Sequence, residues 1–355
     1  MKLYLRGHDD RYAVEQLQLA LFPDEPMEPV DAPFSGDGAV SALHAGKTWL
    51  TATASITLHG KTAKATRRLA LAQADTPSRR RLQSAMTMID TVQAYRPIDW
   101  VLHLGDVVAW GGSWSFWERL YQERQFRNFM WAGVQGNHDY MGRAKGVGSN
   151  DFTRSTTYYP ANGFPEDERI TYHFRYGDVL FLMLNSMTNR TTANISKAKA
   201  WMRQVVRQAR ASQHPPRYVV VCQHFEWFNG RTGQSVDYTR WSEIFDELGV
   251  DLALGGNNHI YVRTDAVYQG LTTDGSKGTV YLQTSASDNE RGRTTSTLRE
   301  NKDLIKRRWT EGKNTIGALC MEVNAQRILL TLLDRYGTVV DTVSVKAKEQ
   351  TERPQ

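Results

Sequence analysis

The chain has 355 residues, which is enough for one large domain or two modest ones. Its content of 40% hydrophobic and 23% charged residues is typical of a globular protein with a water-exposed surface. The net charge of +6 is modest for this length, so it favours anionic substrates weakly and does not by itself indicate nucleic-acid binding. With two cysteines, the sequence predicts neither a disulfide framework nor a cysteine metal site.

No stretch of the sequence indicates insertion into a membrane. The longest apolar run, Val179 to Leu184, is far too short to span a bilayer. Met1 to Asp10 is charged and lacks the apolar core of a signal peptide, which predicts a cytoplasmic location. Residues 347–355 are expected to form a polar tail.

Residues 1–65 are predicted to form a small α+β segment. Tyr12 to Phe22 has apolar residues at helical spacing, whereas Thr48 to Leu58 alternates and predicts a strand. His59-Gly60 then marks a turn, and Thr62 to Leu69 predicts the returning strand of a hairpin. The histidines of this segment are isolated in sequence, so no catalytic site is expected in it.

Strand and helix patterns alternate from residue 66 onward, which predicts a largely parallel sheet covered by helices in a domain of residues 66–346. Strands are expected at Arg68 to Ala74, Asp99 to Leu104, Met130 to Val134, Asp178 to Leu184, Arg217 to Cys222 and Val250 to Leu254. Helices are expected at Ser84 to Tyr95, Trp114 to Phe129, Ser196 to Ala211 and Tyr238 to Leu248. In such sheets ligands collect at the carboxyl ends of the strands.

Strand patterns dominate beyond residue 260, at Gly278 to Thr284, Ile316 to Val323, Arg327 to Leu333 and Thr338 to Val345. Between them, the basic stretch Arg291 to Arg308 is interpreted as a solvated loop with a surface helix. An alternative is that Arg291 or another of its arginines reaches a phosphate group. Nucleic-acid binding by this stretch is disfavoured, because no aromatic stacking pattern or recognised module accompanies the charges.

Polar side chains follow several predicted strands at their carboxyl ends. Asp106 has two oxygens and can bridge two cations, and Asp75, Asn137, His224 and His259 offer further oxygen and nitrogen ligands. Each has an ordinary alternative, such as a helix N-cap for Asp75 or a turn former for Asn137. Their shared placement favours a site for two hard to borderline cations, which suits the hydrolysis of phosphate esters.

Gly105-Asp106, Gly136-Asn137-His138-Asp139, His224 and the Gly-x-x-His of residues 256–259 resemble, as a set, the motifs of the calcineurin-like metallophosphoesterase superfamily. The run from His259 to Arg263 is similar to the last motif of its bacterial purple-acid-phosphatase-like members. The resemblance covers residues 68–345. It implies a four-layer α/β/β/α sandwich with two metal ions between the sheets.

The resemblance also implies roles for individual residues. The first metal ion would be held by Asp75, Asp106 and His259, and the second by Asp106, Asn137, His224 and Asn257. His138 would assist catalysis without binding metal, and a hydroxide bridging the metals would attack phosphorus in line. The metals expected are manganese, iron or zinc. The predicted substrate-binding residues are Tyr140, Arg263 and Arg291.

Three positions depart from the superfamily's pattern. Pro77 stands where a ligand histidine is usual, Asn257 replaces another, and Ala109 stands where purple acid phosphatases carry a tyrosinate. The colour of a tyrosinate–iron pair is therefore not expected. Two functions stay open on this sequence. One is a phosphatase or phosphodiesterase acting on a phosphorylated small molecule or polymer, and the other is a catalytically weakened member that binds metal or phosphate ligands.

A second resemblance concerns Met1 to Gln16, which is similar to the start of the coproporphyrinogen dehydrogenases of Gram-positive bacteria. The chemistry of those enzymes belongs to a radical S-adenosylmethionine domain with a Cys-x₃-Cys-x₂-Cys motif. Cys222 and Cys320 do not form such a motif, so this activity is not implied. The resemblance would place a junction of two unrelated segments near residues 65–80, which would account for the missing histidine at Pro77.

Overall fold

The computed structural model describes residues 16–23, 49–58, 61–70, 76–142, 147–229, 233–288, 302–312 and 314–348. The chain divides into two compact units, residues 1–76 and 77–355, and each is described by itself. Two predicted site residues, Asp75 and Arg291, lie outside the described residues. So do residues 1–15, which carry nearly all of the N-terminal resemblance, and the end of the polar tail from residue 349.

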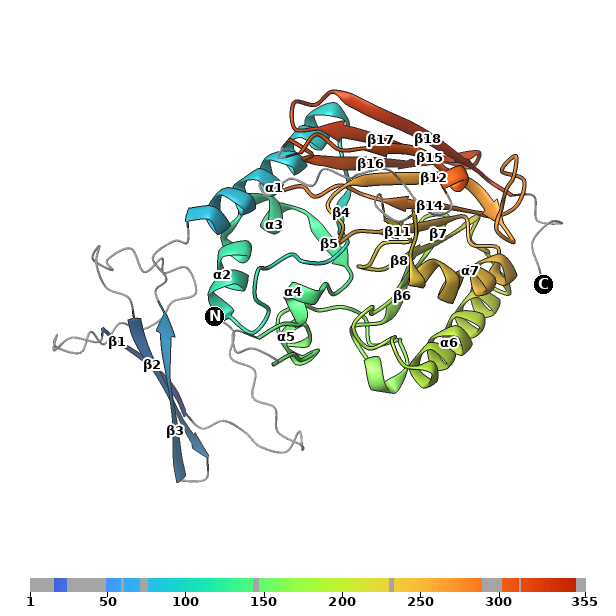
Figure 1. The fold of residues 1–355 in the computed structure, drawn as a ribbon. Coiled ribbons are helices and arrows are strands. Elements are labelled where there is room, and N and C mark those ends of the chain that lie inside the picture. The colour runs from blue at the N-terminus through green and yellow to red at the C-terminus, as the bar shows by residue number, and fades with distance from the viewer. Residues whose placement is uncertain are drawn as a thin grey trace. The chain divides into compact units, whose positions relative to one another are not determined.

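The described part of the first unit is an antiparallel sheet in the order β1-β2-β3 (Figure 1). Its strands are β1 (Gln16–Pro23), β2 (Trp49–Leu58) and β3 (Lys61–Ala70). β2 and β3 confirm the predicted hairpin. The helix predicted over Tyr12 to Phe22 is wrong in its described part, because Leu17, Leu19 and Leu21 alternate with period two and pair with β2. The described part of the strand predicted at Arg68 to Ala74 is not a separate strand, because residues 68–70 are the last three residues of β3.

An eight-stranded mixed sheet forms the centre of the second unit, in the order β13-β12-β14-β11-β8-β7-β6 with β15 paired to β12. The strands are β6 (Tyr172–Tyr176), β7 (Val179–Met183), β8 (Tyr218–Cys222), β11 (Leu252–Gly255), β12 (Tyr261–Tyr268), β13 (Leu271–Thr272), β14 (Thr279–Gln283) and β15 (Ile305–Trp309). β7, β8, β11 and β14 run parallel. The first three confirm the parallel strands predicted from the alternation of strands and helices, and β14 extends the same sheet.

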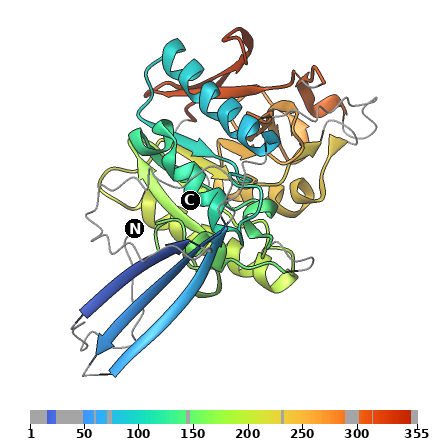
Figure 2. The ribbon, with the colours of Figure 1, turned by 90° about the vertical axis from the view of Figure 1, so that its left-hand side faces the viewer.

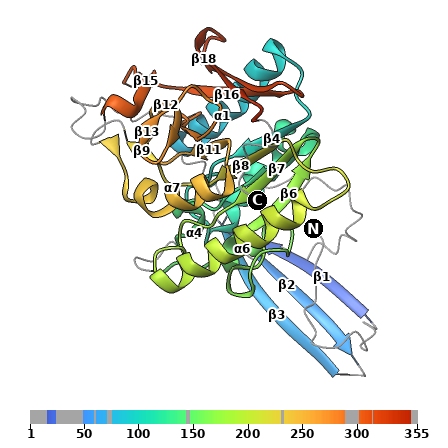
Figure 3. The ribbon, with the colours of Figure 1, turned by 90° about the vertical axis from the view of Figure 1, so that its right-hand side faces the viewer.

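Side chains of the central strands alternate between two hydrophobic layers. On β8, Val219 and Val221 pack toward α6 (Thr192–Arg210) and α7 (Val236–Leu248), which cover one face of the sheet (Figure 3). Val220 and Cys222 pack on the opposite face. Further strands close that second layer, namely the parallel pair β4 (Trp100–His103) and β5 (Met130–Gly133) and the antiparallel sheet β16 (Gly317–Val323), β17 (Arg327–Asp334) and β18 (Val339–Lys346).

A second helical layer covers these smaller sheets. In α1 (Thr76–Tyr95), Val92 packs with Cys320 of β16, and Met86 packs with Trp117 of α2 (Trp114–Gln122). Figure 2 shows α1 in cyan beside the red strands of the β16–β18 sheet. The second unit thus has four layers in the order α/β/β/α, which confirms the predicted fold class.

Short elements complete the described structure. They are α3 (Arg124–Asn128), α4 (Asn137–Tyr140), α5 (Asp151–Arg154), η1 (Pro165–Asp167), η2 (Lys302–Leu304), β9 (Phe228–Asn229) and β10 (Gly233–Gln234). In the described end of the basic stretch, the single 3₁₀ turn η2 leads directly into β15, so a longer surface helix is not formed there. Among the described helices, none combines the length and apolarity needed to cross a bilayer.

Candidate metal centre

Three loops that follow parallel strands bring their polar side chains together. Asp106 follows β4, Asn137 follows β5 and His224 follows β8. The Nε2 atom of His224 lies 3.0 Å from Asn137 Oδ1 and 3.4 Å from Asp106 Oδ1. A carboxylate, an amide oxygen and an imidazole nitrogen, all from residues predicted as metal ligands, therefore face one another.

The loops approach so closely that two positions require glycine. Gly105 adopts a φ of +88°, and a Cβ atom there would lie 2.5 Å from His224 Nδ1. A Cβ at Gly136 would overlap both the backbone nitrogen and the Oδ1 atom of Asp106. Asp106 itself has a φ of 56°, a left-handed conformation that costs a non-glycine residue on the order of 1 kcal/mol. The surrounding contacts therefore hold the Asp106 carboxylate in place against a backbone strain.

Asp139 holds two of these loops in register. Its side chain is buried, and Oδ2 accepts hydrogen bonds from the backbone N–H groups of Asp106 and Gly136, each at 2.8 Å. Oδ1 accepts a third from Val108 at 3.0 Å. Burial, followed by repulsion from Asp106, raises the pKa of Asp139 to about 6. The sequence places Asp139 inside a motif, but its task of joining two loops depends on contacts that only the fold reveals.

His224 presents a nitrogen suited to metal coordination. Its Nδ1 lies 2.6 Å from the Leu104 carbonyl oxygen, and because a carbonyl only accepts, Nδ1 donates the hydrogen. Nε2 then faces the oxygens of Asn137 and Asp106, so three acceptor atoms meet and need a positive charge among them. Metal-binding histidines commonly donate their other ring N–H to a backbone carbonyl in this way. The donor set therefore fits a metal ion.

A proton on His224 can supply that positive charge when no metal ion is bound. The pKa values of His224 and Asp106 are shifted accordingly. Burial disfavours the charged imidazole of His224, but its hydrogen bond to Asp106 and the charge of that carboxylate hold the pKa above its ordinary value. Burial acts to raise the pKa of Asp106, yet the same interactions with His224 bring it below its ordinary value. The pair is thus arranged to stabilise a shared cation.

The last loop carries the two remaining predicted ligands, Asn257 and His259, after β11. The Gly256 N–H donates to the carbonyl oxygen of His224 at 2.9 Å, which joins this loop to the rest of the centre. Asn257 and His259 both have left-handed backbones, with φ of 65° and 59°. Asn257 Nδ2 donates to Glu226 Oε2 at 2.9 Å. Glu226 was not predicted as a site residue, because nothing in the sequence around it indicates this contact.

His138 lies at the edge of this group and is partly exposed. Its Nδ1 atom is 2.9 Å from the carbonyl oxygen of Ala109, and its backbone N–H donates to Asp106 Oδ1 at 2.8 Å. The ring of Trp110 meets the His138 ring edge-on, with centroids 6.2 Å apart. Position and orientation of His138 are therefore determined by the loop that carries Asp106.

A second histidine beneath the centre was not predicted from the sequence. His103 Nδ1 accepts a hydrogen bond from the Gly105 N–H at 3.3 Å, and its Nε2 lies 2.7 Å from the Tyr159 hydroxyl. Burial, with a smaller contribution from the charge of His224, lowers the pKa of His103 to about 4. The ring is thus neutral near pH 7 and supports the Gly105 turn without adding positive charge to the centre.

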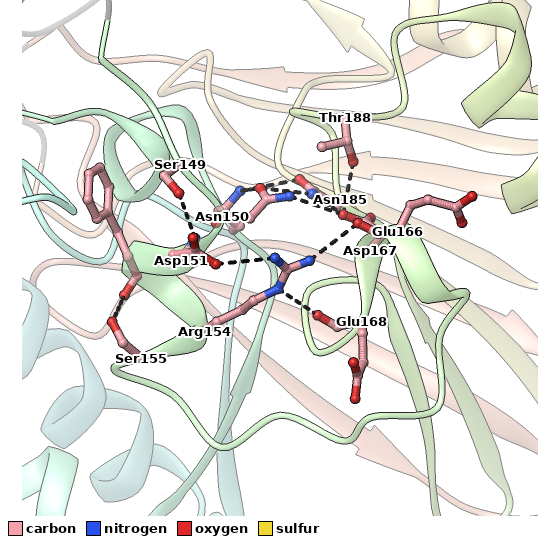
Figure 4. Close-up of polar contacts among 12 residues, drawn as sticks. Ser149, Asn150, Asp151, Arg154, Ser155, Glu166, Asp167, Glu168, Asn185 and Thr188 are labelled. Carbon is pink, nitrogen blue, oxygen red and sulfur yellow. Dashed lines mark hydrogen bonds and ion pairs between the residues drawn. The ribbon is translucent and has the colours of Figure 1, made fainter. Parts of the chain in front are cut away.

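A polar network surrounds the buried Asp167 side chain (Figure 4). Asp167 Oδ1 accepts from Asn185 Nδ2 at 2.7 Å and from the Thr188 hydroxyl at 3.0 Å, and Thr171 donates to Oδ2. Gln135, just before the loop, donates to Asn150 Oδ1 at 2.9 Å, and Asn150 in turn contacts Asp167. The network therefore links the start of the Asn137 loop to the segment before β6, which carries Asp167, and to the segment after β7, which carries Asn185.

Two predicted substrate-binding residues have other contacts in the described structure. The ring of Tyr140 packs over the backbone of Gly148, where a Cβ atom would overlap it. Arg263 on β12 is buried and makes a two-point ion pair with Asp341 of β18, with Nε–Oδ2 at 2.6 Å and Nη2–Oδ1 at 3.2 Å. Tyr261 also donates to Asp341, at 2.9 Å. Arg263 thus joins the two sheets.

Arg263→Ala is expected to lower the free energy of unfolding by about 3 kcal/mol, because it leaves the Asp341 carboxylate, which is only 12% exposed, without its cation. Urea unfolding measures this loss. The matched variant is Arg263→Met combined with Asp341→Leu, which removes both charges and should recover most of the stability. A raised KM for substrate with an unchanged unfolding midpoint would instead show that Arg263 contacts substrate.

Among the described residues, no group of three or more His, Cys, Asp or Glu side chains is gathered closely enough to hold a metal ion. Asp106 and His224 are two such side chains, and the third group beside them is the amide of Asn137. An amide oxygen is a weaker ligand than a carboxylate or imidazole for zinc or iron, and it suits manganese or magnesium better.

The fold and the family match together make this chain a metal-dependent phosphoesterase. The chain belongs to the calcineurin-like phosphoesterase family, whose model matches residues 70–261. It is accordingly a hydrolase of phosphoric esters, and a dinuclear metal centre is typical of this family.

Solved structures share the fold at low sequence identity. A purple acid phosphatase, PPD1, from yellow lupin (Lupinus luteus) seeds matches with a TM-score of 0.57 and 16% identity over 97% of this chain and 71% of its own. GAP50, the anchor in the inner membrane complex of Plasmodium, matches with a TM-score of 0.51 and 11% identity over 76% and 85%. The search of curated proteins gave no significant match.

Proposed function

We propose that the chain hydrolyses phosphoric monoesters or diesters with two metal ions bound at the ends of its strands. The observation that carries this proposal is the convergence of Asp106, Asn137 and His224, whose acceptor atoms face one another around a position suited to a cation. Bound there, metal ions would lower the pKa of a coordinated water and polarise a phosphoryl oxygen. Manganese, iron or zinc would serve.

Each proposed ligand would have its own role. Asp106 has two carboxylate oxygens and would contact both ions. Asn137, His224 and Asn257 would hold one ion with it, and Asp75 and His259 the other. Glu226 supports the role of Asn257, because a carboxylate only accepts hydrogen bonds and so faces the amide nitrogen. The Oδ1 atom of Asn257 therefore faces away from Glu226, which leaves it available to bind a metal ion.

His138 is proposed to act on the substrate. The carbonyl of Ala109 accepts from Nδ1, so Nε2 is the ring atom that can exchange a proton with the leaving-group oxygen or stabilise charge on the phosphoryl group. The hydrogen bonds of His138 to Ala109 and Asp106 orient it before the substrate arrives.

Metal content per chain, measured with hydrolysis of p-nitrophenyl phosphate and bis-p-nitrophenyl phosphate, tests this function. We expect bound metal after loading with manganese, zinc or iron, and turnover of one of the two esters with at least one metal. Neither bound metal nor hydrolysis under any of these conditions would contradict the proposal. Metal binding without turnover of either ester would instead favour a binding module on a weakened phosphoesterase fold.

A further inference from the structure

Trp110 lies on the surface beside His138. Trp110 is 38% exposed, and its ring meets the His138 ring edge-on with centroids 6.2 Å apart. By contrast, Trp117, seven residues further on, is 2% exposed and belongs to the core of the α1–α2 layer. The exposed Trp110 ring is therefore a direct neighbour of His138, the residue proposed above to act on the leaving group.

The loop that carries Trp110 is fixed from several sides. The Gly111 N–H donates to the His138 carbonyl at 2.8 Å, and the Gly112 N–H donates to the Met141 carbonyl at 3.1 Å. Trp117 Nε1 donates to the Gly111 carbonyl at 2.8 Å. A Cβ atom at Gly111 would overlap the backbone of Asp139, so the loop lies directly against the Asn137 loop. Trp110 is thus exposed on a rigid backbone rather than on a loose one.

A rigid, exposed aromatic ring next to a reacting group is well suited to binding a flat partner. An apolar ring left in water costs free energy, and covering it with another π-system recovers that cost. Stacking on an aromatic side chain tolerates many flat rings, because each of them has a π-face. The ring is also preorganised by the loop, so little conformational freedom is lost when the partner binds.

We propose that Trp110 forms a stacking subsite for the alcohol portion of the substrate, and that the preferred substrates are phosphoesters whose leaving group carries a flat ring, such as an aryl group or a nucleobase. This inference rests on the function proposed above, because it places the leaving group next to His138. It adds a selectivity that the metal ligands alone cannot supply, since metal ions contact only the phosphoryl group.

The test uses two non-hydrolysable phosphonates, benzylphosphonate and methylphosphonate, which differ in the flat ring. Calorimetry of the full-length, manganese-loaded protein gives the ratio of their dissociation constants. Trp110→Ala is expected to reduce the preference for benzylphosphonate roughly tenfold, which corresponds to about 1.4 kcal/mol. Trp110→Phe, which keeps a stacking face, should retain most of the preference.

Trp114→Ala is the matched control. Trp114 is 46% exposed, but its ring meets Tyr121 rather than His138, with centroids 5.9 Å apart. Its loss should leave the ratio unchanged, and thermal unfolding checks that each variant is folded. A ratio in Trp110→Ala equal to that of the unmodified protein, with hydrolysis intact, would overturn the subsite alone. Binding of neither phosphonate to the metal-loaded unmodified protein would overturn the subsite together with the proposed function.

Discussion

Replacing Asp106 with asparagine is expected to lower kcat/KM of the metal-loaded protein by about 1,000-fold. Asparagine has the same shape and tolerates the left-handed backbone that Asp106 adopts, with φ of 56°. Its Oδ1 can still accept the hydrogen bond from the His138 N–H. The substitution therefore removes a negative charge and one oxygen ligand while leaving the loop in place. Steady-state kinetics and metal content per chain measure the two consequences.

Asp178→Asn is the control for the loss of a carboxylate elsewhere. Asp178 forms a half-exposed ion pair with Arg217, with Nε–Oδ2 at 3.1 Å, and it lies immediately before β7 rather than after a strand end that carries a proposed ligand. Both kcat/KM and metal content should match the unmodified protein. Retention of full activity and full metal content in Asp106→Asn would show that this carboxylate does not bridge the metal ions.

Asp139→Asn is expected to weaken both the fold and the site, although the side chain never touches the proposed ions. Its two oxygens accept three backbone hydrogen bonds, from Asp106, Gly136 and Val108. An amide has one oxygen, so its NH₂ group would face at least one buried N–H donor. Leaving such a donor unsatisfied costs about 1–3 kcal/mol in the free energy of unfolding.

Urea unfolding of the metal-free protein at pH 8 measures this loss, because Asp139 is ionised well above its pKa of about 6. Metal affinity should also fall, since Asp139 sets the position of the Asp106 turn relative to the Asn137 loop. Asp178→Asn again serves as the control and should unfold like the unmodified protein. An Asp139→Asn variant with unaltered stability and metal affinity would show that the two loops keep their register without this carboxylate.

The central strands and the longer helices could be predicted from the sequence because their side chains follow a single clear pattern. β7 and β8 are continuous apolar runs, as expected of strands buried on both faces, and α6 and α7 have one apolar side each. β12 could not be predicted in this way, because Arg263, Thr264 and Asp265 interrupt its pattern. Arg263 and Thr264 are nonetheless buried, with Arg263 paired to Asp341 on another sheet.

The residues of the candidate site also fall into two groups, those that local sequence patterns predict and those that they do not. The strand-end placement of Asp106, Asn137 and His224 was visible in the sequence, because the strands before them are regular. The supporting residues were not predicted, since their roles arise from contacts between distant segments. Glu226 orients Asn257, His103 supports the Gly105 turn, and the Asp167 network joins segments on either side of β6 and β7. Local patterns carry no information about such pairings.

Of the five described non-glycine residues with positive φ, three are Asp106, Asn257 and His259. Glycine would relax all three backbones, yet it would also delete a candidate ligand each time. Backbone strain of on the order of 1 kcal/mol is therefore retained at each of these positions. At these three positions selection for stability and selection for the proposed chemistry therefore act in opposite directions, and replacement by glycine should favour the first at the expense of the second.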